Sequence, residues 1–380
     1  MKSTFTPVAL SKASDPVIIH RFSNGDILQR DEKAIVACFS GKRKVLSTSP
    51  HNGGYRENLK WVFNHDCKQE GQDPSAMEAP TYEEHMVVIA SELGLDSDFT
   101  AGISTAASMV NASIKSGTYL DTTVTAVVTA GIDINGGRAG DPATWHETDG
   151  QVVYTPGTIN ILLFINADLP EGSLVRALVT CTEAKTAALQ ELMAPSCYST
   201  GLATGSGTDG TILVANADSK VKLTWAGKHS KLGELIGRMV IMAVKEALFL
   251  QTNLCAERQF NILRRLGRFG ITEESLWQLS SESGLTRQEF STRLNNLINQ
   301  SELVVHTSLY AHLMDQLQWG LIRQADAQPA VKNLFILMEM EPAVLPDPCV
   351  DCKQFIEKMV LCYSRGIIKM IEHNGRFCKT

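Results

Sequence analysis

A glycine-rich segment, Thr204–Asp209, places three hydroxyls and a carboxylate close together. Glycines let a ligand approach the backbone, and successive backbone N–H groups can bind an anion. Ser206 or Thr208 could act as a nucleophile, with Asp209 orienting a base, and direct attack by water is the third route. The alternative is a structural turn in which Asp209 bonds local backbone. The substrate-contact candidates of this segment are Thr204, Gly205 and Gly207.

Three further titratable candidates lie in two other polar signatures. His229, in GKHSKLGELIG, precedes an expected helix, and its neutral imidazole could take up a proton and deliver it to an amine. The alternatives are a surface histidine beside two lysines or, less favoured, a metal ligand. Glu183, a catalytic candidate, and Lys185, a substrate-contact candidate, flank Ala184 on an expected helix. Residues two apart do not share a helix face, so one can face the site while the other is solvated. A charged helix surface is the competing interpretation.

A second loop, after an expected strand at 122–130, combines Asn135, Arg138 and Asp141 with glycines. Asn and Arg can donate hydrogen bonds, and Asn and Asp can accept them, so this loop suits a polar ligand that carries both donors and acceptors. A structural turn with Arg138 paired to Asp141 is the alternative. Asn52 and Asn160 are weaker binding candidates of the same type.

The elements that must position these residues read as an α+β arrangement. Short apolar runs separated by turn residues predict a β-rich beginning, and a helix is expected at 82–93. TINILLFI is nearly all apolar, which predicts a strand buried on both faces. Strands alternate with long helices up to about residue 251, which implies a layered α/β sandwich. The later elements are strands at 122–130, 158–165 and 211–215 and helices at 171–192 and 233–252.

Size and composition set limits on the class of protein. The chain has 380 residues, 44% of them hydrophobic, a net charge of −6 and a pI near 5.9. Such a charge favours neither a nucleic-acid surface nor an anionic membrane. The first residues lack the apolar core of a secretory signal, and nine scattered cysteines suit reduced thiols, so we expect a cytoplasmic protein. We predict two domains, 1–252 with the signatures and a helical 253–380.

The signatures, taken in order, resemble those of the adenosylcobinamide amidohydrolase family from roughly residue 17 to residue 247. The most specific stretch is GLATGSGTDG, with YST before it and AGKHSKLGE after it; Ser206 stands where the family usually has threonine. The resemblance implies hydrolysis of the amide between the corrin ring's propionyl arm and aminopropanol, giving adenosylcobyric acid for cobalamin salvage. It implies a corrinoid substrate that carries its own cobalt and no further cofactor or metal. A fainter similarity to self-processing aminopeptidase-type amidases suggests an αββα fold.

The resemblance does not cover the C-terminal region. There, 273–305 reads as helix, turn, helix and short strand, a winged-helix-like pattern with Thr286–Leu297 as its recognition helix. Its acidic residues outnumber its basic ones, which favours a protein-interaction or homodimerisation module over a DNA reader. A last helix is expected at 352–372. Cys349, Cys352, Cys362 and Cys378 could bind zinc, but their spacing favours packing cysteines.

Two classes of function therefore remain. The first is a corrinoid amidohydrolase with a helical extension. The second is a non-catalytic corrinoid sensor that acts through the C-terminal helices. The presence of Ser206, Thr208, Asp209 and His229 favours the enzyme.

Overall fold

The computed structural model describes residues 16–68, 77–143, 146, 157–281, 284–341 and 351–373. It separates into two compact units. One unit holds the chain up to Cys255 except Ser199–Gly201, and the other holds those three residues and the chain from Ala256. The division falls close to the boundary expected at 252. None of the helices within these ranges is long and apolar enough to cross a membrane.

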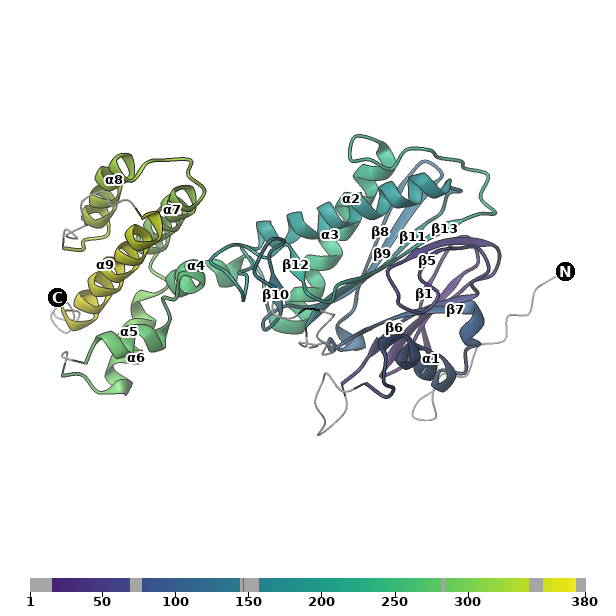
Figure 1. Cartoon of the computed structure of the whole chain (residues 1–380), viewed down its shortest axis with the longest axis horizontal. Coiled ribbons are helices and arrows are strands. Elements are labelled where there is room, and N and C mark those ends of the chain that lie inside the picture. Colours follow the sequence, from purple (N-terminus) through teal and green to yellow (C-terminus); the bar gives the residue numbers. More distant parts are fainter. Residues whose placement is uncertain are drawn as a thin grey trace. The chain divides into compact units, whose positions relative to one another are not determined.

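The first unit stacks two β-sheets face to face (Figure 1). The first sheet has the order β1 (Val17–Arg21), β2 (Ile27–Arg30), β3 (Ala34–Cys38), β6 (Trp61–Asp66) and β7 (Thr100–Thr105). The second has the order β5 (Gly54–Arg56), β4 (Arg43–Ser47), β13 (Gly210–Asn216), β11 (Thr158–Ile165), β9 (Thr122–Gly131) and β8 (Ser113–Tyr119). The pairs β6–β7 and β11–β13 are parallel, and the other pairs are antiparallel.

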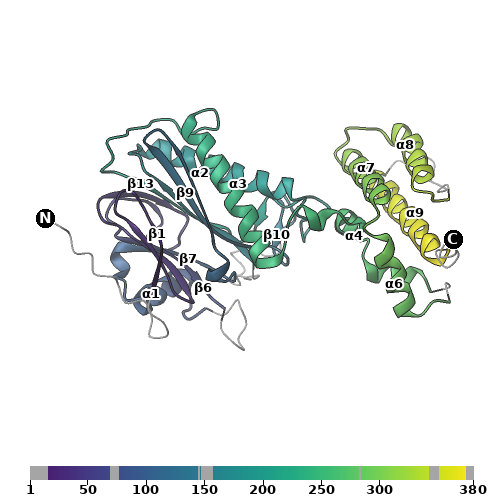
Figure 2. The same ribbon diagram turned by 180° about the vertical axis from the view of Figure 1, so that it is seen from behind.

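Helices cover both outer faces of this sandwich (Figures 1 and 2). Two long helices, α2 (Glu171–Glu191) and α3 (Lys231–Thr252), pack on the second sheet, and α1 (Tyr82–Glu92) packs on the first. Short 3-10 turns lie at Ser97–Phe99 and Met109–Asn111. The unit is therefore an α+β fold with four layers, which confirms the expected sandwich and helical appendage.

The alternation of residues along β9 explains the layering. Val124, Ala126, Val128 and Ala130 face the helices, while Val127 belongs to the apolar core between the sheets. Threonines lie on the same inner face on both sides of Val127: Thr129 bonds Asn64 of the first sheet, and Thr125 bonds Ser116 of β8. The space between the sheets is therefore apolar in the middle and polar at both ends.

The second unit is helical throughout its described residues and has its own core. After a 3-10 turn at Glu257–Gln259 come α4 (Ile262–Leu266), a 3-10 turn at Gly267–Phe269, α5 (Glu273–Leu279) and α6 (Arg287–Leu297). They are followed by α7 (Ser301–Gln318), α8 (Gln324–Leu337) and α9 (Cys352–His373).

The prediction of a strand after α6 is wrong, because a helix, α7, occupies these residues. The β-strand that a winged-helix fold requires at this position is therefore not formed. Val304 and Val305, whose β-branched side chains suggested a strand, lie in the first turns of α7. Leu303, Val304 and Thr307 are buried along one side of that helix, and Thr307 bonds the buried Tyr363 hydroxyl of α9. Packing of this face against α9 outweighs the weak strand preference of valine.

Candidate functional site

Asp209 lies directly before β13, and its carboxylate accepts hydrogen bonds from three residues. Oδ1 accepts the Ile159 N–H at 2.9 Å and the Ser206 hydroxyl at 2.7 Å. Oδ2 accepts the Ser206 N–H at 3.1 Å and pairs with the Lys185 ammonium. The Lys185 and Asp209 side chains are only 11% and 13% exposed. A hydroxyl held against a largely buried carboxylate–ammonium pair is an arrangement that can activate a nucleophile. We call these residues the Asp209 cluster: Lys185, Ser206 and Asp209.

The topology of the unit brings these residues together. Because β11 and β13 are parallel, Ile159 and Asp209 both lie at the same ends of their strands. Helix α2 leaves the opposite end of β11 and runs back across the sheet, which returns Lys185 to the end where the chain enters β11. Glu183, two residues earlier, faces solvent and pairs with Lys228 at 3.1 Å. Of Glu183 and Lys185, Lys185 is therefore the one that faces the site.

Two signature loops are joined by a very short β-ladder beside the cluster. Strand β10 (Gly136–Gly137) pairs antiparallel with β12 (Gly205–Ser206). A Cβ atom added to Gly205 would lie 2.3 Å from Asp209 Oδ2 and 2.7 Å from Lys185 Nζ. A side chain here would displace the ends of the Lys185 and Asp209 side chains, because the backbone passes directly against the ion pair. The first loop thus helps to fix the position of Ser206.

Thr208 is held by the residues that begin β11. Its hydroxyl donates to the Gly157 carbonyl at 3.0 Å, and its own carbonyl accepts the Thr158 hydroxyl at 2.8 Å. Asn135 donates to the same Gly157 carbonyl at 2.8 Å. The Tyr198 hydroxyl donates to Asn135 Oδ1 at 2.8 Å, which orients the Asn135 amide so that its nitrogen faces Gly157. Tyr198 was not among the predicted site residues, although its position in the YST signature was the available signal.

The polar inner end of the sandwich lies behind the cluster. The Asn160 amide donates to Asn64 at 2.7 Å and to the Ser104 carbonyl at 2.9 Å, and its oxygen accepts the Gly210 N–H at 3.1 Å. Asn160 is 1% exposed. Its side chain therefore supports the start of β13 and has little hydrogen-bonding capacity left for a substrate. Asn64 was missed because nothing in its local sequence predicts a contact with a strand so distant along the chain.

Arg138 and Asp141 do not form the ion pair considered from the sequence. Asp141 Oδ2 accepts the backbone N–H of Arg138 at 2.8 Å and the Ser196 hydroxyl at 2.6 Å. Among the described residues, none makes a recorded ion pair with the half-buried Arg138 guanidinium. Thr204 connects this loop to the cluster: its hydroxyl accepts the Ala139 N–H at 2.9 Å, and its N–H donates to the Gly137 carbonyl.

Asn52 lies at the same end of the second sheet, in the turn between β4 and β5. Its amide donates to the Ser97 and Thr100 carbonyls at 2.8 and 2.9 Å, and its φ is +53°. These contacts fasten the turn to the start of β7. They show a structural use of the Asn52 amide, with no recorded bond to the Asp209 cluster.

The structure does not bring His229 to the Asp209 cluster. His229 is exposed and precedes α3, and Lys231 in the first turn of α3 lies 4.8 Å from the ring centre of Tyr119. Tyr119 ends β8 beside the turn to β9, and Val124 of β9 pairs with Ile165, the last residue of β11. Asp209 contacts Ile159 near the first residue of β11. A rise of about 3.3 Å per residue separates the two ends of that strand by about 20 Å.

Two cysteines near the cluster are poor competitors for the role of nucleophile. Cys181 is buried on α2, and burial raises the pKa of its thiol to about 12. Burial also raises the pKa of Cys197, which follows Ser196 in the loop before β12. Both thiols therefore stay protonated near pH 7, and only the thiolate is a strong nucleophile.

Metal-ligating side chains do not gather within the described residues: no three His, Cys, Asp or Glu are placed to hold an ion. Of the cysteines considered for zinc, Cys349 and Cys378 lie outside the described residues. Cys352 bonds the Leu317 carbonyl at 3.3 Å, and Cys362 lies half-buried on α9.

The family model that matches this chain covers the region that holds the Asp209 cluster. The family model described as adenosylcobinamide amidohydrolase matches residues 18–256. The uncharacterized protein MJ1613 of Methanocaldococcus jannaschii is 34% identical over 241 residues, which cover 60% of this chain and 91% of that protein. The crystal structure of the PH0078 protein from Pyrococcus horikoshii OT3 is 13% identical, covers 68% of this chain and 92% of its own, and has a TM-score of 0.29.

Proposed function

The chain belongs to the adenosylcobinamide amidohydrolase family, and from this premise we propose that it hydrolyses the amide between the corrin ring and aminopropanol in adenosylcobinamide. The products are adenosylcobyric acid and aminopropanol, and the reaction serves cobalamin salvage. The observation that carries the proposal is the Asp209 cluster, in which a serine hydroxyl, a carboxylate and an ammonium meet inside the region matched by the family. The cobalt enters as part of the substrate, so no resident metal has a part in the proposal.

Ser206 is the preferred nucleophile. Its hydroxyl donates to Asp209 Oδ1, so attack on the amide carbonyl passes the hydroxyl proton to that carboxylate. The C–N bond then breaks, the leaving amine takes the proton, and water hydrolyses the resulting ester. Lys185 neutralises charge beside the reacting centre, and the exposed Gly207 presents a backbone N–H for the oxyanion directly after Ser206. Attack by water held on the same carboxylate is the competing route.

Arg138 is the proposed contact for the corrin periphery. Corrinoids carry many amide side chains, and a guanidinium offers five N–H donors to amide carbonyls. Its loop is held by Asp141 and Thr204 next to β12, so the backbone of Arg138 lies close to the strand that carries Ser206. Asn135 contributes indirectly, through the Gly157 carbonyl.

The first prediction tests activity and nucleophile together. Adenosylcobinamide incubated with the protein should release free aminopropanol, measured by mass spectrometry. Ser206→Ala should lower turnover by about three orders of magnitude or more, because the attacking oxygen is removed. Rapid quenching of the wild type should trap corrinoid as an ester on a peptide that contains Ser206.

Glu183→Gln is the matched control. Glu183 lies on α2, the helix that carries Lys185, but its recorded ion pair, with Lys228, is at the surface, so the turnover of this variant should stay near the wild-type value. Near-normal turnover in Ser206→Ala with no trapped ester would assign the attack to water. Binding of the corrinoid without any product from the wild type would overturn the enzymatic proposal and favour the sensor.

A further inference from the structure

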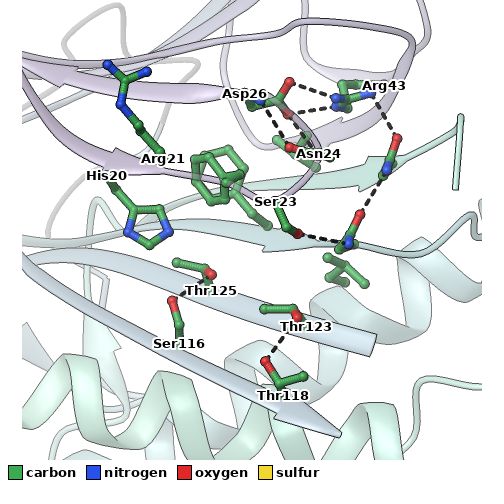
Figure 3. Close-up of a pocket in the computed structure, with 16 residues that line it drawn as sticks. His20, Arg21, Ser23, Asn24, Asp26, Arg43, Ser116, Thr118, Thr123 and Thr125 are labelled. Carbon is green, nitrogen blue, oxygen red and sulfur yellow. Dashed lines mark hydrogen bonds and ion pairs between the residues drawn. The ribbon is translucent and has the colours of Figure 1, made fainter. Parts of the chain in front are cut away.

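A polar cavity opens between the sheets at the end opposite the Asp209 cluster. It has a volume of about 270 Å³ and lies between β1 on one side and β8 and β9 on the other (Figure 3). Phe164 of β11 lines it and pairs with Thr125, whereas Ile159 contacts Asp209. These positions on β11 are about 17 Å apart at 3.3 Å per residue. Apolar core residues, Val127 and Leu162 among them, fill the space between.

Hydroxyls replace apolar side chains on the inner face of the sheet here. The Ser116 and Thr125 hydroxyls lie 2.8 Å apart, and those of Thr118 and Thr123 lie 3.0 Å apart. Each pair shares one hydrogen, so one hydroxyl hydrogen and further lone pairs of each pair stay available. The inner face of a sandwich is normally apolar, so these hydroxyls are a local departure from that pattern of the kind found at functional sites.

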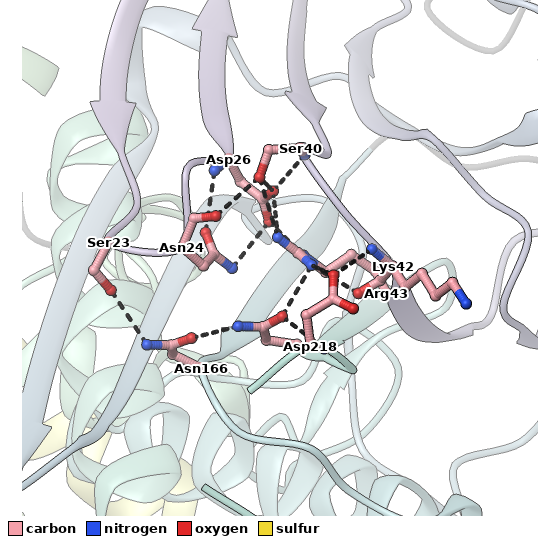
Figure 4. Close-up of polar contacts among 9 residues, drawn as sticks. Ser23, Asn24, Asp26, Ser40, Lys42, Arg43, Asn166 and Asp218 are labelled. Carbon is pink, nitrogen blue, oxygen red and sulfur yellow. Dashed lines mark hydrogen bonds and ion pairs between the residues drawn. The ribbon is translucent and has the colours of Figure 1, made fainter. Parts of the chain in front are cut away.

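One wall of the cavity is built from a saturated polar network (Figure 4). The Arg43 guanidinium donates twice to Asp26, at 2.7 Å each, and at 2.9 Å to Asn216. Its remaining bonds go to the Lys42 carbonyl and the Ser40 hydroxyl. Arg43 and Asp26 are 2% and 1% exposed, so their charges cancel inside the protein and leave nothing for a ligand. The network continues through Asn166 to Ser23 and makes the wall rigid.

The groups that face the cavity carry no net charge. Figure 3 shows His20 directed toward the hydroxyl pairs and Arg21 directed away from them. Burial lowers the pKa of His20, so its imidazole is neutral at pH 7 and offers one donor and one acceptor. Phe22 and Phe164 add an aromatic surface, with ring centres 4.6 Å apart.

We propose that this cavity binds a small neutral ring compound that carries hydroxyls, of the size of a monosaccharide or a nucleoside. Paired serine and threonine hydroxyls complement a sugar diol, and the two phenylalanines complement a flat ring face. The volume lies just below the usual range for small-molecule sites, which restricts the occupant to a single sugar or a nucleoside. The site is independent of the proposed amide hydrolysis.

The test uses D-ribose and adenosine as probes of the full chain, by isothermal titration and saturation-transfer NMR. We expect saturable binding of at least one, and adenosine should bind tighter if the base contributes stacking. Thr125→Val, which removes a hydroxyl with little change in shape, should weaken binding about tenfold. Ser116→Ala, at a more exposed position, should weaken it several-fold.

Thr122→Val is the matched control, because Thr122 lies on β9, like Thr125, but on the opposite face of the strand. The affinity of this variant for each probe should equal that of the wild type. Asp209→Asn should also leave probe binding unchanged, which separates the cavity from the Asp209 cluster. Absence of saturable binding of both probes would overturn the proposal, as would equal affinities in Thr125→Val and Thr122→Val. If the wild type binds a probe but releases no aminopropanol from adenosylcobinamide, the proposed amide hydrolysis is contradicted while the proposed cavity ligand is not.

Discussion

The residue with the clearest effect on stability outside the site is His65 of β6. It faces α1, its ring centre lies 6.4 Å from that of His85, and its Nδ1 is buried with no partner among the described residues. Burial is the main cause that lowers the pKa of His65 to about 3, and the charge of His85 adds to it. The neutral form is therefore the one that the fold accepts.

The sign of the pH effect follows from this lowered pKa. The unfolded chain has a histidine pKa near 6.5 and takes up a proton first as the pH falls, so the contribution of His65 is full above about pH 6.5 and is lost toward pH 3. Each pH unit in that window costs about 1.4 kcal/mol of unfolding free energy. His65→Phe should therefore lose about 2 kcal/mol less than the wild type between pH 7 and pH 5. Urea unfolding of each protein at several pH values, monitored by hydrogen exchange of β6 peptides, measures this difference. His229→Gln is the control, because His229 is exposed and its removal should leave the pH dependence unchanged. Equal pH slopes in wild type and His65→Phe would contradict the assignment.

Single residues also show what the sequence can and cannot predict. Ser206 and Asp209 are three positions apart in one glycine-rich signature, so their contact was accessible from local pattern. The partner of Asp209 was not, because Lys185 reaches it only through the return of α2 across the sheet. His229 lies in an equally distinctive signature, yet no recorded contact joins it to the Asp209 cluster. Signature membership alone therefore does not indicate which residues meet.

At the scale of elements, continuous apolar runs were predicted best. The bounds of β11 agree with the expected 158–165, since its eight residues are all buried. β6 and β8 were not predicted. β6 ends in Asn64, His65 and Asp66, and β8 is rich in hydroxyl residues, so both resemble turn sequences. The β10–β12 pair was beyond prediction: two residues from each of two distant loops carry no periodic signal.

That short ladder supports a prediction about glycine in the site. Gly205→Ala should reduce turnover at least a hundredfold, because its Cβ would displace the Lys185–Asp209 pair while leaving the core untouched. Gly207→Ala is the matched control, since its Cβ would approach nothing closer than 3.5 Å, at Asn135 Oδ1. Its turnover should stay within a few-fold of the wild type. Steady-state kinetics with circular dichroism as a folding check decides between them, and equal turnover in the two variants would show that the close approach at Gly205 is unimportant.

At the scale of the whole molecule, two hydrophobic cores support independent folding of the units. The helical unit has its own core and an internal ion pair between Arg268 and Asp315, at 2.6 Å and 3% and 10% exposed. Arg268 also donates to the Thr200 carbonyl, within the Ser199–Gly201 segment that groups with this unit. Every recorded partner of the Asp209 carboxylate belongs to the other unit.

Residues 1–255 expressed alone should therefore fold and keep kcat within about tenfold of the full chain. KM should rise, because Ser199–Gly201 loses its Arg268 contact only a residue from Tyr198, whose hydroxyl orients Asn135.

Arg268→Gln in the full chain should reproduce this rise in KM, because it removes the same contact with the Thr200 carbonyl. Arg323→Gln is its control, since the one recorded ion pair of Arg323 with a described residue is with Asp326, on the surface of α8. The measurement is kcat and KM for aminopropanol release from adenosylcobinamide, with circular dichroism of each variant. A well-folded 1–255 protein without activity would show that the helical unit contributes to the chemical step itself, because the Asp209 cluster and its partners are all retained in that fragment.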